Sequence, residues 1–156
     1  MIEFLFLLCF SLHNLEEALW LPKWSKYVKK YHKEVSENEF RFAVIFITAF
    51  GYLITFQHLI YSSSLNISKY IYFGFILMMV LNVIFPHLIL TIVLKKYAPG
   101  IITGLILNAP IGIYLLAINI KTINEMIYTL ISSFIITIIF LIIINILFKI
   151  WNKLLN

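Results

Sequence analysis

The sequence predicts an all-α fold, a single domain over residues 1–156 that forms a bundle of five transmembrane helices. Hydrophobic residues make up 62% of the chain and charged residues 12%, whereas a soluble domain is roughly 45–50% apolar and about 25% charged. A helix needs about 20 mostly apolar residues to cross the hydrocarbon core of a membrane. Five stretches meet that requirement, over residues 2–21, 40–61, 70–94, 100–119 and 127–148.

This composition excludes several classes of protein. A chain with so few polar residues cannot cover the surface of a soluble enzyme, a disordered tail or a free nucleic-acid-binding protein. The single cysteine, Cys9, excludes a disulfide framework and a paired-cysteine metal motif. Membrane lipids, and not nucleic acid, are therefore the expected partners of this basic chain.

The distribution of basic residues predicts the orientation in the membrane. Only Lys69 and Lys121 lie on one side of a five-span chain. The other ten lie on the opposite side: Lys23, Lys26, Lys29, Lys30, Lys33, Arg41, Lys95, Lys96, Lys149 and Lys153. Because basic residues are retained in the cytoplasm, the N-terminus is expected outside the cell and the C-terminus in the cytoplasm.

The basic loop between the first two spans has a helical pattern of its own. Apolar residues recur at helical spacing over residues 22–35, and lysines fill the opposite face. The pattern predicts an interfacial amphipathic helix that binds anionic lipid of the inner leaflet. Ser36 and Glu39 have the spacing of a capping box, which predicts the start of the second span.

Ionisable residues inside the first span are the main functional signal, because such residues are costly in hydrocarbon. The segment HNLEE places His13, Glu16 and Glu17 on one helical face, at positions i, i+3 and i+4. An imidazole and two carboxylates can bind a divalent cation or share a proton. A placement of both glutamates in the headgroup region is the simpler alternative.

Helix arithmetic brings further polar residues to the same depth. At about 1.5 Å per residue, Glu17 lies about 9 Å inside Lys23 and His13 about 15 Å. His87 and Asn108 each lie eight residues inside the nearest span end, or about 12 Å. They are further site candidates, although each could also serve as an interhelical hydrogen-bonding group. Asn82 is a weaker candidate, because five residues separate it from His87 and place the two on different faces of an ideal helix.

The third and fourth spans contain helix interruptions near these residues. Pro86 and Pro110 cannot donate a backbone hydrogen bond, which predicts a kink or a free carbonyl group in each span. Gly100, Gly104, Asn108 and Gly112 recur every four residues. A stripe of small residues predicts close contact with a neighbouring helix.

Three segments together resemble the HXXEE family of small bacterial membrane proteins. They are HNLEE, the pair Asn82 and His87, and the segment that contains Tyr97, Pro99, Gly100 and Thr103. The resemblance runs from the first span to the fourth. It implies a polytopic protein, expected in the bacterial cytoplasmic membrane, with a metal or enzymatic site, and it names no substrate.

The leading functional hypothesis is a metal-dependent membrane hydrolase with a lipid or amphiphile substrate. His13, Glu16 and His87 would match a common catalytic zinc set that leaves one position for water. Glu17 would act as the general base, although the residues alone leave open which glutamate binds the metal. Iron is the less favoured metal.

Two other classes of function fit the same residues. A proton or cation transporter could use the polar cluster, and the glycine and proline interruptions are typical of transport helices. Five spans show no repeated halves, so a transporter would need a homo-oligomer to enclose a pathway. A non-catalytic membrane interaction protein is the third class.

Overall fold

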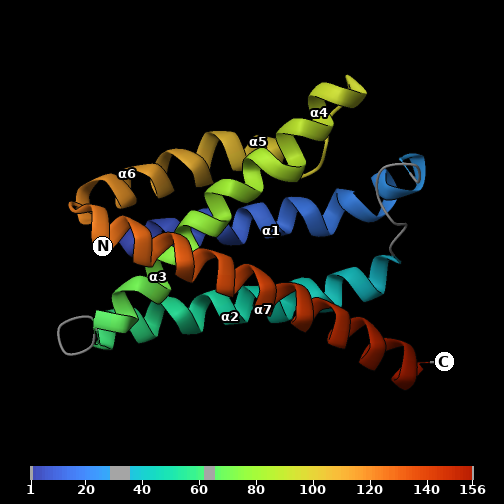
Figure 1. Cartoon of the computed structure of the whole chain (residues 1–156). Coiled ribbons are helices and arrows are strands. Elements are labelled where there is room, and N and C mark those ends of the chain that lie inside the picture. The colour runs from blue at the N-terminus through green and yellow to red at the C-terminus, as the bar shows by residue number, and fades with distance from the viewer. Residues whose placement is uncertain (1, 29–35, 62–65, 156) are drawn as a thin grey trace.

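The computed structural model describes residues 2–28, 36–61 and 66–155, and every regular element in these ranges is a helix. Five stretches are long and apolar enough to cross a membrane: Ile2–Tyr27, Glu37–Tyr61, Asn66–Leu94, Ile101–Asn119 and Ile123–Trp151. The predicted all-α bundle of five spans is thus confirmed. The side of the membrane on which each terminus lies stays a prediction, although the described termini occupy opposite ends of the bundle (Figure 1).

The first two spans are longer than predicted. Helix α1 (Ile2–Tyr27) continues through Pro22, so the first part of the predicted loop helix belongs to α1. Residues 29–35 of that predicted helix lie outside the described residues. Helix α2 (Glu37–Tyr61) begins directly after Ser36, whose Oγ accepts a hydrogen bond of 3.3 Å from the backbone N–H of Glu39. The capping residue inferred from the sequence is therefore confirmed.

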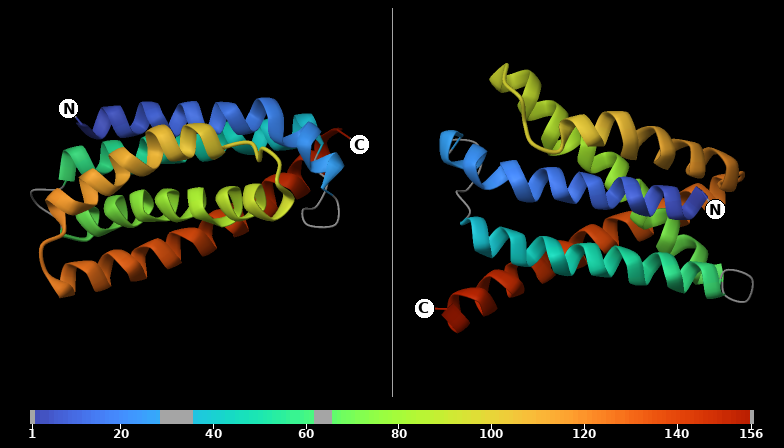
Figure 2. Two further views of the ribbon diagram at one scale, coloured as in Figure 1. Left: turned by 90° about the horizontal axis from the view of Figure 1, so that it is seen from above. Right: turned by 180° about the vertical axis from the view of Figure 1, so that it is seen from behind.

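Helix α3 (Asn66–Asn82) lies at the centre of the bundle, in contact with α2, α6 (Ala109–Asn119) and α7 (Ile123–Leu155). Figure 2 shows it between α7 on one side and α1 with α6 on the other. Three fully buried rings join it to α1, because Phe6 and Phe10 both pack edge-on against Phe75. Such pairs fix the relative position of the two helices beyond the area that they bury.

The crossing of α3 and α7 depends on Gly74. A Cβ atom at this position would lie 2.6 Å from Cβ of Ser132 and 2.8 Å from the backbone nitrogen of Ser133. Glycine and serine thus let the two backbones approach closely, as small residues do at helix contacts in membranes. From this crossing, α7 diverges from the rest of the third span toward the C-terminus (Figures 1 and 2).

The third span is interrupted beside its proline, as the sequence predicted. A π-helical segment, η1 (Val83–Leu88), joins α3 to α4 (Ile89–Leu94). Within it, Phe85 has non-helical angles, φ −127° and ψ 116°. A residue that precedes proline is driven toward this extended region by contact with the proline ring. The kink therefore follows directly from Pro86.

The fourth span also changes its helical form. It consists of α5 (Ile101–Thr103), the π-helical segment η2 (Gly104–Asn108) and α6. Its small-residue stripe faces the third span, because Gly104 packs against Val83 and Gly112 against Val80. The close helix contact predicted from the stripe is therefore confirmed.

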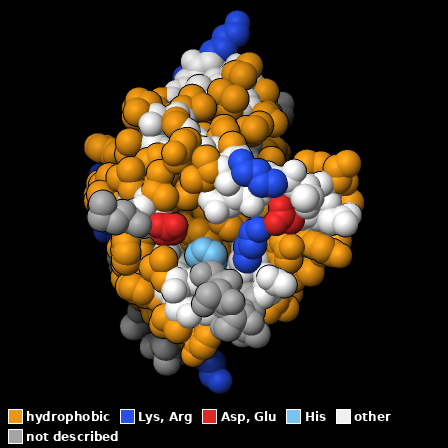
Figure 3. All heavy atoms as spheres, turned by 90° about the vertical axis from the view of Figure 1, so that its left-hand side faces the viewer, with side chains coloured by type: hydrophobic (Ala, Val, Ile, Leu, Met, Phe, Trp, Pro, Cys, Tyr) orange, Lys and Arg blue, Asp and Glu red, His pale blue; other side chains and the backbone are white. Residues whose placement is uncertain are grey.

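A few charged side chains lie among hydrophobic ones at the end of the bundle that carries the N-terminus, which Figure 3 views along the helices. Here Lys69 of α3 pairs with Glu125 of α7 at 2.5 Å. Glu125 also accepts from the backbone N–H of Thr122, while Thr122 Oγ1 accepts from that of Glu125. This reciprocal arrangement is a capping box, and it fixes the start of the last span.

A leucine at position 74 should force α3 and α7 apart. Because the blocking atoms include backbone, we expect Gly74→Leu to lower the unfolding free energy by about 1–3 kcal/mol, the usual cost of overpacking. Denaturation in detergent, followed by circular dichroism, measures the change. Ala117→Leu adds similar volume at an exposed position of α6 and should leave stability unaltered. Equal stability of the two variants would contradict the close crossing.

Candidate functional site

Two histidines and one glutamate converge between α1 and η1. His13 and Glu17 lie one turn apart on α1, and His87 approaches from η1 across the proline kink. The Nε2 atom of His87 lies 2.9 Å from Oε1 of Glu17, and that of His13 lies 3.7 Å from the same oxygen. Potential ligand atoms of these residues all lie within 4.8 Å of one another. Both imidazoles are buried, at 0% and 3% exposure, while the side chain of Glu17 is 16% exposed.

Asn82 completes the cluster, contrary to the expectation that it would face away from His87. Its Nδ2 atom lies 3.2 Å from Nε2 of His87 and 3.4 Å from Nε2 of His13. The expectation is wrong because it assumed an ideal α-helix between the two residues. The wider turn of η1 and the extended angles at Phe85 bring residues five apart onto one side.

Glu16 has a different environment from its neighbour Glu17. One carboxylate oxygen accepts hydrogen bonds from the hydroxyl of Tyr97 and from the backbone N–H of Gly100, the latter at 2.8 Å. The other accepts from the backbone N–H of Thr103 at 2.9 Å and from its hydroxyl at 2.5 Å. A carboxylate offers about four acceptor positions, so these four donors saturate it. Glu16 thus fastens α1 to the start of the fourth span, where free backbone N–H groups favour a negative charge.

The same contacts determine the orientation of His13. Nδ1 of His13 lies 3.2 Å from Oγ1 of Thr103, the hydroxyl that donates to Glu16. Because a hydroxyl has one proton, Thr103 can only accept from His13, which therefore carries its proton on Nδ1. In the neutral imidazole the lone pair of His13 then lies on Nε2, the atom that faces Glu17 and His87. Metal-binding histidines are commonly held in this way through their other ring nitrogen.

The hydrogen-bonding demands on His87 conflict when the cluster is considered without a cation. Its Nε2 contacts a carboxylate oxygen, which requires a donor, and the amide nitrogen of Asn82, which requires an acceptor. A single imidazole nitrogen carries either a proton or a lone pair, not both. A 180° turn of the Asn82 carboxamide would let a protonated Nε2 donate to both neighbours. A cation among His13, Glu17 and His87 would instead use one electron pair from each of the three residues.

Gly100 shapes the wall of the cluster and adopts φ +94°, which glycine tolerates best. A Cβ atom there would lie 2.6 Å from Cε1 of His87 and 2.9 Å from Cε1 of His13. Its conformation and its lack of a side chain are both required, because the two rings occupy the space. Partial burial and the adjacent Glu16 raise the pKa of Tyr97, so its hydroxyl stays protonated as a donor.

Asn108 shares the burial expected of a site residue, but not its contacts. It is fully buried, and neither its Oδ1 nor its Nδ2 has a hydrogen-bond partner within the described part of the chain. The structure thus brings together His13, Glu17, His87 and Asn82, while Glu16 lies one contact away through Thr103.

Sequence reasoning left Tyr97, Gly100 and Thr103 without individual roles. Tyr97 and Thr103 appeared only in the family resemblance, and Gly100 also as a member of the small-residue stripe. None of these three residue types is unusual in a membrane protein. One signal could have pointed to them. A carboxylate inside a span requires hydrogen-bond donors, and the backbone N–H groups at the start of a helix, here marked by a glycine, are free to donate. The pairing of two segments more than 80 residues apart is what the sequence did not reveal.

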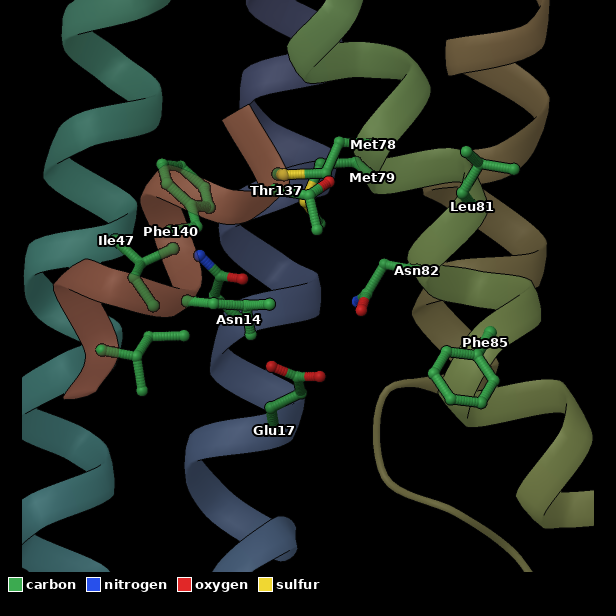
Figure 4. A pocket seen from close by; sticks show the side chains of 12 residues that line it. Asn14, Glu17, Ile47, Met78, Met79, Leu81, Asn82, Phe85, Thr137 and Phe140 are labelled. Carbon is green, nitrogen blue, oxygen red and sulfur yellow. The ribbon is translucent and has the colours of Figure 1, made fainter. Parts of the chain in front are cut away.

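The cluster opens onto a cavity of about 360 Å³ between α1, α3 and α7. Figure 4 shows the carboxylate of Glu17 and the carboxamide of Asn82 facing one another across this space. Its walls are mainly apolar and include Met78, Phe140 and Leu141. A small molecule could therefore reach Glu17 without unfolding the bundle.

Comparison with known proteins assigns the chain to a family. Residues 4–115 match the model of the family described as "Protein of unknown function with HXXEE motif". This chain is 53% identical to the uncharacterized protein YrkK of Bacillus subtilis (strain 168) over 114 residues, which cover 72% of each of the two chains. No solved structure matches it. The region matched by the family model contains Glu16 with its four hydrogen-bond donors, and also His13, Glu17 and His87. The chain therefore belongs to the HXXEE family.

Proposed function

We propose that this protein is a metal-dependent membrane hydrolase whose ligands are His13, Glu17 and His87. The observation that carries the proposal is the convergence of three potential ligand atoms within 4.8 Å, two from buried histidines and one from a partly buried glutamate. The fixed tautomer of His13 supports it, because the lone pair faces the place where a cation would bind. Ionisable groups at this depth are costly unless they are paired, hydrogen-bonded or bound to a cation.

Zinc is the metal that this set of residues fits best. Two histidines and one glutamate form a common catalytic zinc set, which leaves a fourth position for water. The same set also occurs in non-haem iron enzymes that activate oxygen. We place zinc first because the proposed reaction needs a water nucleophile and no electron transfer.

The proposal gives the two glutamates roles that differ from those first suggested by the sequence, since Glu17 takes both the ligand and the base roles and Glu16 takes neither. Glu16 has no acceptor position left, so it acts by positioning His13 through Thr103. Glu17 would hold the metal, and its carboxylate would also accept a proton from the attacking water. Bound zinc would lower the pKa of that water toward about 7 and polarise a carbonyl or phosphoryl oxygen of the substrate.

The setting of the site supports a substrate that dissolves in the membrane. The cluster lies within spans whose outer surfaces carry many large exposed hydrophobic side chains. We place the protein in the bacterial cytoplasmic membrane, with membrane lipids around it and anionic lipid at its basic end.

Metal content distinguishes this function from the alternatives. We expect about one zinc per detergent-purified chain, and loss of that zinc in His13→Ala, Glu17→Gln and His87→Ala. Elemental mass spectrometry measures it, with circular dichroism to verify folding. His58→Ala is the matched control, because His58 is also buried but lies near the far end of α2 and outside the cluster.

Metal-free protein, purified without chelators, would contradict the proposal. Ion flux in proteoliposomes that depends on Glu17 would then favour a transporter. Loss of partner binding in the same variants, without flux, would favour an interaction protein.

Thr103 should control metal affinity although it does not contact the cation. Thr103→Val removes the hydroxyl that orients His13, and loss of such a supporting group commonly weakens metal binding by about 10–100-fold. Thr103→Ser retains the hydroxyl and should restore most of the affinity. Competition with a chromophoric chelator measures both. Equal affinity of the valine and serine variants would contradict the positioning role.

A further inference from the structure

The cavity beside the cluster has the location and lining of a site for one hydrocarbon chain. Its volume of about 360 Å³ is at the lower end of the range that holds a small ligand, roughly 300–1,000 Å³. Apolar side chains from α2, α3 and α7 form most of its wall. Polar groups are confined to a few positions, of which Glu17 and Asn82 belong to the cluster.

The cavity opens sideways, toward the region that lipid would occupy. Leu81, Phe85 and Leu141 all line it, yet they are 47%, 69% and 56% exposed. The opening arises where α7 diverges from the third span after their crossing at Gly74. A lipid chain could therefore enter between η1 and α7 without passing through water.

The residues that line the cavity are spread along the length of the third and fifth spans. Met78 and Thr137 line it near the middle of the spans Asn66–Leu94 and Ile123–Trp151. Phe85 and Ile144 line it closer to the end that carries most of the basic residues. A chain inserted from that leaflet would thus pass Glu17 and extend toward the centre of the bilayer.

The chemistry of the lining favours a neutral reacting group. None of the described lining residues is a lysine or arginine, the side chains that bind phosphate. Glu17 lies about 9 Å inside the basic boundary at Lys23, which is deeper than a charged headgroup would descend. A neutral carbonyl, by contrast, can enter hydrocarbon at modest cost and accept a hydrogen bond from an amide such as that of Asn82.

From these observations we infer that the substrate is a neutral fatty acyl ester, held by a single acyl chain in the cavity with its carbonyl at Glu17 and Asn82. This inference rests on the proposed function and specifies its substrate. The oxygen of the activated water bonds to the carbonyl carbon, and the bond from that carbon to the alcohol oxygen breaks. The alcohol oxygen takes up a proton, so the products are a fatty acid and a neutral alcohol.

Photocrosslinking in nanodiscs tests the chain site independently of catalysis. The probe is a long-chain monoacylglycerol with a diazirine in its acyl chain. We expect adducts on peptides that contain Met78 and Phe140, and competition by unlabelled monoacylglycerol. A phospholipid with the same diazirine chain should label the outer surface without that preference. Preferential labelling of the cavity by the phospholipid probe would overturn the neutral-lipid assignment.

Two adjacent residues of α7 provide a matched pair of variants. Leu141 and Ile142 are 56% and 52% exposed, but only Leu141 lines the cavity. Leu141→Trp should weaken probe binding about tenfold, as expected when about two methylene groups lose their buried contacts. Ile142→Trp should bind the probe as the unmodified protein does. Equal labelling of both variants would overturn the inference.

Zinc content, measured on the same samples, separates the two hypotheses. Both tryptophan variants should retain full zinc, since neither residue is one of the three proposed ligands. Normal zinc with no cavity-specific labelling would reject the substrate and leave the metal site intact. Specific labelling without zinc would reject the hydrolase and retain the lipid site. With both present, release of fatty acid from monoacylglycerol, but not from its ether analogue, should follow.

Discussion

The hydrogen bonding of one carboxylate determines much of the arrangement around the site. Glu16 lies in a membrane span, where an unpartnered negative charge would be strongly unfavourable. Four donors from the segment between Tyr97 and Thr103 satisfy it. Because those donors belong to the start of the fourth span, the same contact joins the first and fourth spans and turns Thr103 toward His13. The two adjacent glutamates therefore have different partners, since Glu16 joins two spans while Glu17 lies beside His13 and His87.

The interruptions in the helices have a related physical role. A regular third span would place Asn82 and His87 on different faces, and His87 would then have no amide beside it. Pro86 removes one backbone hydrogen bond, and η1 re-forms the helix with a wider turn. Irregular backbone is tolerated at this depth only where it is enclosed by protein or lines a cavity. The kink thus brings Asn82 and His87 together within the cluster. The cavity lies beside it, where α7 diverges from the third span beyond their crossing at Gly74.

Much of the fold and part of the site could be predicted from the sequence. Length and hydropathy specify five spans, because the bilayer imposes a nearly fixed helix length. The cost of charge in hydrocarbon singles out His13, Glu16 and Glu17, and helix rise places His87 at a similar depth. Ser36 caps the second span and the glycine stripe packs against the third span, as the sequence predicted.

The tertiary structure decided how these residues are divided between tasks. Helical spacing places both glutamates on nearly the same face of α1, so it could not show that one meets Tyr97 and Thr103 while the other meets His87. Asn82 was misplaced because ideal helix geometry does not include the wider turn of η1. The cavity also depends on how α3 and α7 cross, and helix packing angles are set by contacts among distant residues. The sequence therefore determined which side chains enter the membrane, and only the packing of the spans determined which of them meet.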